Sequence, residues 1–297
     1  MLRKPAVSGA FYEASRERLI KQIEDCFFSC RGPGHLPGEK QKPEVLGLVA
    51  PHAGYAFSGA CAAHAYAQLN PAKEAAFVIL GVNHSEIGSS SVSLSDFETP
   101  LGTARNDLQL SRKIASFSMI PSDERPHFYE HSIEVQVPFL QYICRERLRI
   151  VPIIVDFSCD YAKLASAMLL AAKELAREVV VIASSDFTHY GPNYGETGLG
   201  ESAEQKVKED DLSTIQHILK KSPEDFFNAA RMKTICGIHT ITALLHYISL
   251  AEKTKQVDSK PELLKYYQSS EIMPSGSFVG YASIVFRKAG PALKTQK

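Results

Sequence analysis

The distribution of apolar residues predicts strands that alternate with helices along the chain. Four short segments are apolar at consecutive positions, as expected of strands that are buried on both faces of a sheet. These four segments are 44–50, 75–81, 148–155 and 178–184. The segment 90–97 alternates more between apolar and polar residues, which predicts a strand nearer a sheet edge. Two further strands are predicted near the end of the chain, at 263–269 and 277–286.

Helical spacing of apolar residues fills the segments between the strands. The segment 15–30 shows this spacing, and Ser15 is suited to cap the helix. Further helices are predicted at 57–69, 107–117, 130–144, 161–176, 201–219, 223–231 and 238–250. Pro138 is expected to tilt or end the first part of the helix that contains it. A glycine-rich loop at 191–200 either covers a site or only connects two elements.

Continuous apolar strands separated by helices are typical of an α/β fold. Such a fold has a mainly parallel central sheet with helices on both faces. No repeat of fixed period and no linker of disordered composition divides the sequence. We therefore expect a single domain over residues 1–297, with a polar tail from Ala289 onward.

Composition excludes several classes of function. The 33 Lys and Arg residues balance the 33 Asp and Glu residues, so no net charge attracts nucleic acid or an anionic membrane. No apolar stretch is long enough to span a bilayer, and the N-terminus lacks the apolar core of a signal peptide. A cytoplasmic protein without nucleic-acid or membrane partners is expected.

The six cysteines do not suggest a secreted disulfide framework, because none forms a CxxC pair and their spacing is scattered. Five of them are expected to be small buried apolar residues. Cys26 and Cys30 lie four positions apart on a predicted helix and are expected on one face of it.

Two histidines directly follow predicted strands. His52 lies in the motif APHAGY (50–55), and His84 lies in the motif GVNH (81–84). The carboxyl ends of strands in an α/β fold point at the active crevice. A lone histidine is more often structural, but two at strand ends favour a shared site. Together with one thiolate they could hold a transition metal.

Cys236 is the candidate for that thiolate. It lies in the motif TICG (234–237), and a helix is expected to start near Gly237. A thiolate at a helix N-terminus has a lowered pKa, which suits a metal ligand, a nucleophile or a redox thiol. The alternative is a buried cysteine at the start of the helix.

The motif SSDFTHY (184–190) also follows a predicted strand. Asp186 lies three residues before His189, close enough to orient its imidazole, and His189 would then be a general acid or base. The alternative is a turn in which Asp186 caps the backbone.

The motif EHSIE (130–134) opens a predicted helix and places His131 and Glu134 on one face. The pair could support a site, or the motif is simply an acidic first turn that the helix dipole favours. The sequence contains no GxGxxG, no GxxxxGK[ST] and no HExxH, so nucleotide-triphosphate and zincin functions are unsupported.

These motifs, taken in order, resemble the Memo family over nearly the whole chain. The matching segments are SGAFY (8–12), APHAGY (50–55), AAHAY (62–66), ILGVNH (79–84), EHSIE (130–134), SSDFTH (184–189), TICG (234–237) and GYA (280–282). The family is similar in fold to class III extradiol dioxygenases, which implies a three-layer α/β/α sandwich.

The resemblance also implies the roles of the site residues. The dioxygenases hold Fe(II) with two histidines and a glutamate, and in Memo-like proteins a cysteine takes the place of the carboxylate. The metal ligands implied here are His52, His84 and Cys236. The implied acid or base is His189 with Asp186 beside it, and the residues expected around the ligands are His131, Glu134 and Tyr55. Iron(II) is the expected cofactor, with copper or zinc as alternatives because a thiolate is a soft ligand. In microbes such proteins accompany an AMMECR1-like protein and a radical-SAM protein, which are the expected partners.

Three functions remain open. The first is a non-haem metal redox protein, and more specifically an oxygen-dependent enzyme that acts on a small molecule or a peptide. The second is a module that binds a peptide or protein in the same crevice, lined by aromatic residues near the motifs: Tyr55, Phe57 and Tyr190. The third is a metal-free enzyme with Cys236 as nucleophile and His189 or His239 as base.

Overall fold

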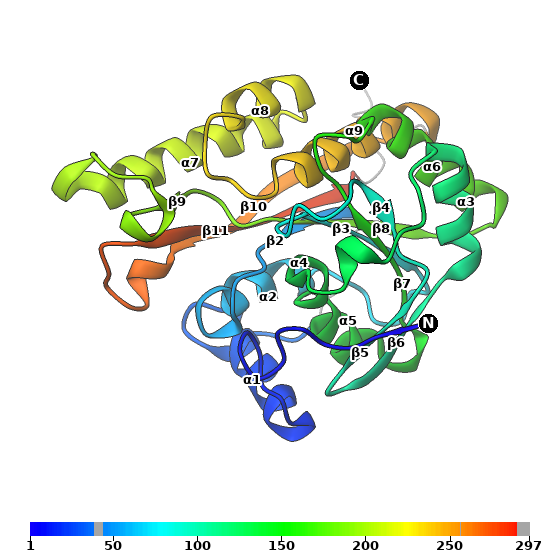
Figure 1. The fold of residues 1–297 in the computed structure, drawn as a ribbon, viewed down its shortest axis with the longest axis horizontal. Helices are drawn as coiled ribbons and strands as arrows, with labels where there is room; N and C mark the ends of the chain where they lie inside the picture. The colour runs from blue at the N-terminus through cyan, green and yellow to red at the C-terminus, as the bar shows by residue number, and fades with distance from the viewer. Residues whose placement is uncertain (39–43, 256, 290–297) are drawn as a thin grey trace, which may run out of the picture.

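A mixed, mostly parallel sheet forms the middle layer of the structure, and helices cover both of its faces (Figure 1). The computed structural model describes residues 1–38, 44–255 and 257–289. Within these residues the strand order is β1-β5-β6-β7-β3-β8-β2-β11-β10, with β4 paired to β7 and β9 paired to β11. The α/β class and the three layers expected from the sequence are confirmed.

The strands are β1 (Leu2–Arg3), β2 (Val45–Ala50), β3 (Ala76–Gly81), β4 (Ser91–Val92), β5 (Asp96–Thr99), β6 (Gly102–Asn106), β7 (Arg149–Ile154), β8 (Val179–Ser184), β9 (His189–Tyr190), β10 (Ser259–Gln268) and β11 (Phe278–Lys288). At the centre of the sheet β7, β3, β8 and β2 run parallel to one another. Strands β11 and β10 extend the sheet in antiparallel fashion beyond β2.

The α-helices are α1 (Arg16–Phe28), α2 (Ala60–Tyr66), α3 (Leu108–Ser118), α4 (His131–Glu134), α5 (Val137–Cys144), α6 (Tyr161–Glu174), α7 (Ala203–Leu219), α8 (Pro223–Ala230) and α9 (Ile238–Lys255). Helices α3, α6, α8 and α9 pack on one face of the sheet, and α1, α2 and α5 pack on the other (Figure 1). Ser15 caps α1 as expected, since its hydroxyl accepts a hydrogen bond from the backbone N–H of Arg18.

Burial on both faces explains why the central strands are apolar at every position. In β3, Val78 and Leu80 join the core on the α6 and α9 side, whereas Phe77 and Ile79 join the core on the α2 and α5 side. All residues of β2, β3 and β8 are buried. Alternate side chains of a strand point to opposite faces, so a strand covered on both sides needs apolar residues throughout.

Two predicted segments differ in detail, and one strand was not predicted. The segment 130–144 is divided into α4 and α5, with Pro138 in the first turn of α5, as its ring requires. The segment 90–97 contains β4 and the start of β5, and β5 lies near the sheet edge as expected. Strand β6 was not predicted, because its residues are mostly polar and largely exposed.

One cysteine, Cys30, is not buried as the sequence predicted. Four are buried, namely Cys26, Cys61, Cys144 and Cys159, and all six are free thiols. Cys30 is exposed because α1 ends at Phe28, so it does not share a helix face with Cys26 and that expectation was wrong. The tail from residue 290 onward lies outside the described residues. Among the helices of the described chain, none is both long and apolar enough to cross a bilayer.

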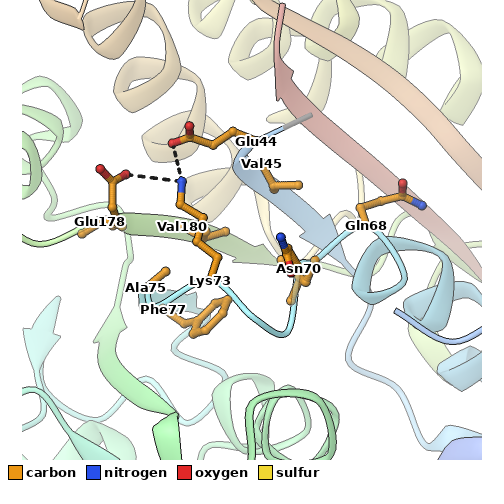
Figure 2. Close-up of a pocket in the computed structure, with 11 residues that line it drawn as sticks. Glu44, Val45, Gln68, Asn70, Lys73, Ala75, Phe77, Glu178 and Val180 are labelled. Carbon is orange, nitrogen blue, oxygen red and sulfur yellow. Dashed lines mark ion pairs between the residues drawn. The ribbon is translucent and has the colours of Figure 1, made fainter. Parts of the chain in front are cut away.

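The amino ends of β2, β3 and β8 border a cavity of about 150 Å³ (Figure 2). Lys73 lies there between two carboxylates, with its Nζ atom 3.0 Å from Glu44 Oε1 and 3.8 Å from Glu178 Oε2. The ammonium group is therefore already neutralised by the cavity's own residues. Because β2, β3 and β8 run in the same direction, this cavity at their amino ends lies at the end of the sheet opposite to the histidine motifs and is not part of their site.

A buried ion pair fixes the N-terminal segment against α4. Arg3 Nη1 lies 2.6 Å from Glu134 Oε2, and both side chains are almost completely buried. The Glu134 carboxylate also accepts hydrogen bonds from Tyr12 Oη and from the backbone N–H groups of Ala6 and Val7. Arg3 also donates to the backbone carbonyls of His127 and Glu130. A buried pair with all its hydrogen-bonding groups satisfied tolerates the loss of neither partner.

We expect Glu134→Gln to lower the free energy of unfolding by about 3–5 kcal/mol, because it leaves the Arg3 charge buried without a counter-charge. Urea denaturation followed by circular dichroism measures the change. Glu98→Gln is the control, since it breaks the exposed pair with Lys4 and should cost no more than about 1 kcal/mol. Equal losses for the two variants would show that the buried pair has no special role.

Candidate metal centre

The site is assembled at the carboxyl ends of three adjacent parallel strands. Strand β8 lies between β2 and β3, with Ser184 paired to Ala50 and Ala183 paired to Leu80. The residues that follow these strands are His52, Asp186 and His84, and they gather at one edge of the sheet. The motifs that follow these strands were predicted to meet in this way.

Three imidazoles form the centre of this site. Ligand atoms of His52, His84 and His131 all lie within 4.8 Å of one another, and together they could hold a metal ion. The ring centroids are 5.3 Å apart for His52 and His84, 5.4 Å for His52 and His131, and 4.6 Å for His84 and His131. His52 is buried, His131 is half-buried and His84 is exposed, so the group is open on one side. His131, expected only beside the ligands, is a member of the group.

A hydrogen-bond network determines which nitrogen of His52 carries the proton. Ser184 Oγ donates its single proton to the backbone carbonyl of Ser132 (2.7 Å) and accepts from Gln136 Nε2 (2.8 Å). Its contact with His52 Nδ1 at 2.9 Å therefore has the imidazole N–H as donor. The lone pair of His52 is then on Nε2, the nitrogen available to a metal.

Glu130 fixes the proton of His84 on Nδ1 in the same way. Its carboxylate lies 3.0 and 3.2 Å from His84 Nδ1, and it also accepts from the backbone N–H of His84 (2.9 Å). It caps α4 through the N–H of Ser132 (2.7 Å). Burial opposes ionisation of this carboxyl, but its hydrogen bond with His84 and the charges of His84 and His131 outweigh burial and lower the pKa of Glu130 to about 2. Glu130 was not predicted as a site residue; its only sequence signal is its place directly before His131.

Burial favours the neutral forms of His52 and His131, which metal binding requires. Burial lowers the pKa of His52 well below its ordinary value, and the neighbouring His131 and His84 lower it further. Burial also lowers the pKa of His131, although Glu130 partly opposes the change. A neutral imidazole offers its lone pair without first releasing a proton.

Cys236 lies beside His52 but outside the three-histidine group. Its Sγ atom is 3.2 Å from His52 Nε2 and accepts from the backbone N–H of Asp186 at 3.2 Å. Burial, with the charge of Asp186, raises the pKa of the Cys236 thiol well above its ordinary value. The lowered pKa expected from the helix N-terminus was wrong, because loss of hydration outweighs the helix dipole. The role of Cys236 as a metal ligand stays a prediction.

Two motif glycines are required by close packing at this site. A Cβ atom on Gly81 would lie 2.4 Å from Ile133 Cγ1, and one on Gly237 would lie 2.2 Å from Ser185 Cβ. Gly81 thus allows α4 to approach the end of β3, and Gly237 allows the Cys236 segment to approach the end of β8. Glycine is required at both positions because a side chain would not fit there, and not because the backbone adopts an unusual conformation.

Asp186 does not orient His189 in the way expected. Its carboxylate accepts from the backbone N–H of His52 (2.8 Å), whereas His189 Nδ1 lies 2.9 Å from the backbone carbonyl of Thr234. Burial raises the pKa of Asp186, although the charge of His189 and the backbone N–H groups of His52 and Ala53 oppose the change. The Thr234 carbonyl must accept from Nδ1, which leaves His189 Nε2 with a lone pair. The ring of Tyr194, from the glycine-rich loop, packs edge-on against His189 at 5.0 Å.

Other predicted residues have structural tasks. Glu134 binds Arg3, as described above, and the Tyr55 hydroxyl donates to the backbone carbonyl of Val135 (2.7 Å). Tyr55 and Tyr190 are both buried, so they do not form the aromatic lining expected for a peptide crevice. His239 Nδ1 is bound to the hydroxyl of Tyr161 at 2.6 Å and does not serve Cys236 as a base.

Comparison with known proteins gives matches along the length of the chain. A family model described as "Memo-like protein" matches residues 3–285. A "MEMO1 family protein" of Thermococcus onnurineus is 40% identical over 303 residues, covering 97% of this chain and 100% of that protein. One of Sulfurisphaera tokodaii is 38% identical over 304 residues, covering 96% and 99%. One of Methanopyrus kandleri is 38% identical over 300 residues, covering 97% and 100%. The matched region contains every residue of the site.

We expect Glu130→Gln to weaken binding of Zn²⁺ by about 10- to 100-fold, because the neutral amide no longer fixes the proton of His84 on Nδ1. Competition with a chromogenic chelator measures the affinity. Glu86→Gln is the matched control, since it removes an exposed carboxylate two residues from His84. An equal effect of both variants would mean that only the nearby negative charge matters.

We expect Cys236 in metal-free protein to react slowly with iodoacetamide at pH 7–8 and faster as the pH rises. Its pKa is raised by burial, so the reactive thiolate forms only at high pH. Mass spectrometry of digested protein follows the alkylation, with the exposed Cys30 as internal reference. Rapid modification of Cys236 at pH 7 would contradict this assignment.

Proposed function

The chain belongs to the Memo family, and we propose that it is a non-haem metal redox protein. The observation that carries this proposal is the group of three imidazoles at the strand ends, two of which have their protons directed to Nδ1 by Ser184 and Glu130. Iron(II) is the proposed metal, with copper or zinc as alternatives, because imidazole suits all three.

The proposed ligands are His52 and His84, with Cys236 as the third ligand that the family resemblance implies. Cys236 Sγ already contacts His52 Nε2. Three protein ligands leave coordination positions open, and the exposed side of His84 gives access to them. A bound iron or copper ion would supply electron transfer and a position for substrate.

His189 is the proposed acid or base. Its Nδ1–H group is held by the Thr234 carbonyl, so Nε2 can accept a proton and later return it. The charge of His189 contributes to the lowered pKa of His52, which supports its proximity to the metal ligands. Tyr194 packs against the ring and restricts its rotation.

A specific observation supports peptide or protein binding as a second function. Four large apolar side chains are exposed on the loops that carry or adjoin the site, namely Ile87, Phe128, Tyr129 and Phe157. Phe128 and Tyr129 directly precede Glu130, and Ile87 lies three residues after His84. Exposed apolar residues around a crevice are typical of a surface that receives another chain. The metal-free cysteine enzyme is disfavoured, since burial raises the pKa of Cys236.

We expect protein purified without oxygen to contain about one equivalent of iron or copper, and His52→Ala to lower that content at least about tenfold, because it removes a ligand. Element analysis measures the content, and His35→Ala is the control from a loop outside the site. Full occupancy in His52→Ala would overturn the site.

Electron paramagnetic resonance tests the redox part of the proposal on the same sample. The anaerobic sample should give no signal from Fe(II) or Cu(I), a signal of Fe(III) or Cu(II) should appear on exposure to air, and dithionite should remove it again. Zinc as the sole metal, or a signal that does not respond to reductant, would contradict the redox function while leaving a metal site.

A further inference from the structure

We propose that Asp211, on α7, is a positioning residue for His189, and that it acts through the turn that leads to this histidine. The turn is the segment 185–188, between the end of β8 and His189 at the start of β9. The inference rests on the proposed function in one respect, namely that His189 is the acid or base.

The Asp211 carboxyl group holds the last residue of the turn at two points. Its Oδ1 atom accepts from the Thr188 hydroxyl at 2.6 Å and from the Thr188 backbone N–H at 3.4 Å. Its Oδ2 atom accepts from the Tyr266 hydroxyl, on β10, at 2.8 Å. Because Thr188 directly precedes His189, these bonds fix both the side chain and the main chain next to the imidazole.

Asp211 is completely buried, and no cationic side chain of the described residues forms an ion pair with it. The titratable groups that face it are Tyr266 and Asp210. Burial raises the pKa of Asp211 to about 6, and the charge of Asp210 adds to the change, whereas the hydrogen bonds from Thr188 and Tyr266 oppose it. Burying a carboxyl group without a cation is costly, so the orientation of the turn, and not stability, accounts for its presence.

Gly280, from the motif GYA (280–282), provides the space for this carboxyl group. A Cβ atom on Gly280 would lie 2.3 Å from Asp211 Oδ2 and 3.0 Å from Tyr266 Oη. The backbone of Gly280 also bonds to the turn, since its N–H donates to the Thr188 carbonyl (3.0 Å) and its carbonyl accepts from the Phe187 N–H (2.8 Å). The turn is therefore held by β11 and by α7 together.

Helix α7 also holds the second segment that fixes His189. Thr234 accepts from the backbone N–H of His189 (3.0 Å) and donates to its carbonyl (2.6 Å), in addition to the contact with the ring. The preceding residue, Lys233, pairs with Asp210 Oδ2 at 2.7 Å. Two consecutive carboxylates of α7 are thus bound to the two segments that fix the histidine.

A cavity next to these segments shows why the hydrogen bonds matter. Thr188 and Thr234 both line a cavity of about 280 Å³ between α7 and the glycine-rich loop. Side chains do not fill the space on this side of the two segments, so close packing does not fix them there. The bonds of Thr188 to Asp211 therefore set the position of the turn.

Nitrogen NMR of the imidazoles in metal-free protein at about pH 7.5 tests the proposal. The unaltered protein should show His189 with its proton on Nδ1 only, because the Thr234 carbonyl accepts it. Asp211→Ala and Thr188→Val should each lose this single tautomer and show both. Glu209→Gln, an exposed carboxylate two residues from Asp211 on the same helix, is the control and should show no change.

The signals of His189 are identified by their loss in His189→Gln, and thermal unfolding shows which variants are folded. If Asp211→Ala does not fold, Thr188→Val decides, since it removes the same contact and keeps the shape of the side chain. A single Nδ1–H tautomer in the folded variants would overturn the proposal.

A pH profile provides a readout that a merely structural role would not change. The Thr188 amide signal should show an inflection near pH 6 as Asp211 ionises. Asp211→Asn should abolish this inflection, and Tyr266→Phe should move it to higher pH, because it removes a donor that stabilises the carboxylate. An inflection that persists in Asp211→Asn would contradict the assignment. These measurements need no metal, so failure of the metal test above would remove the proposed function and leave their outcome unaffected.

Discussion

The site depends on one constraint, the parallel alignment of β2, β8 and β3. Because β8 pairs with both neighbours, the positions of His52 and His84 are set by the register of one sheet. The last residue of β8, Ser184, then connects this sheet edge to α4 through its bonds to His52 and to the Ser132 carbonyl. Because the Ser184 hydroxyl donates its only proton to a carbonyl, it must accept from the imidazole, which fixes both the position of the ring and the nitrogen that carries its proton.

Helix α4 has only four residues and could not persist without tertiary contacts, since a single turn is too short to be stable alone. It is held at three points: Glu130 caps its start, the Ser132 carbonyl accepts from Ser184, and Glu134 pairs with Arg3 near the N-terminus of the chain. The buried charges of Arg3 and Glu134 are costly to bury, and hydrogen bonds satisfy them on both sides. This arrangement places His131 against His84, and the ring of Phe11 from the N-terminal segment packs edge-on against His131 with ring centroids 4.9 Å apart.

The sequence allowed prediction of the features that depend on local pattern. Strands buried on both faces, the cap at Ser15, the break at Pro138 and the two strand-end histidines all have signals within a few residues. The missed features depend on contacts between distant segments. Glu130 binds His84 across 46 positions of sequence, and Thr234 binds His189 across 45. The pKa of Cys236 was predicted in the wrong direction because helix position can be inferred from sequence, whereas depth of burial depends on the complete fold.

The charges around the histidines indicate why the third ligand matters. Burial lowers the pKa of His52 and of His131, which favours their neutral forms, and the Glu130 carboxylate adds a negative charge 3.0 Å from His84 Nδ1. A divalent ion held by three imidazoles would retain most of its charge and favour an anionic group at its open position. A thiolate from Cys236 would cancel one unit of that charge and weaken the preference. Under the proposed function, the third ligand would therefore set the charge that the open side of the site, beside the exposed His84, presents to a bound group.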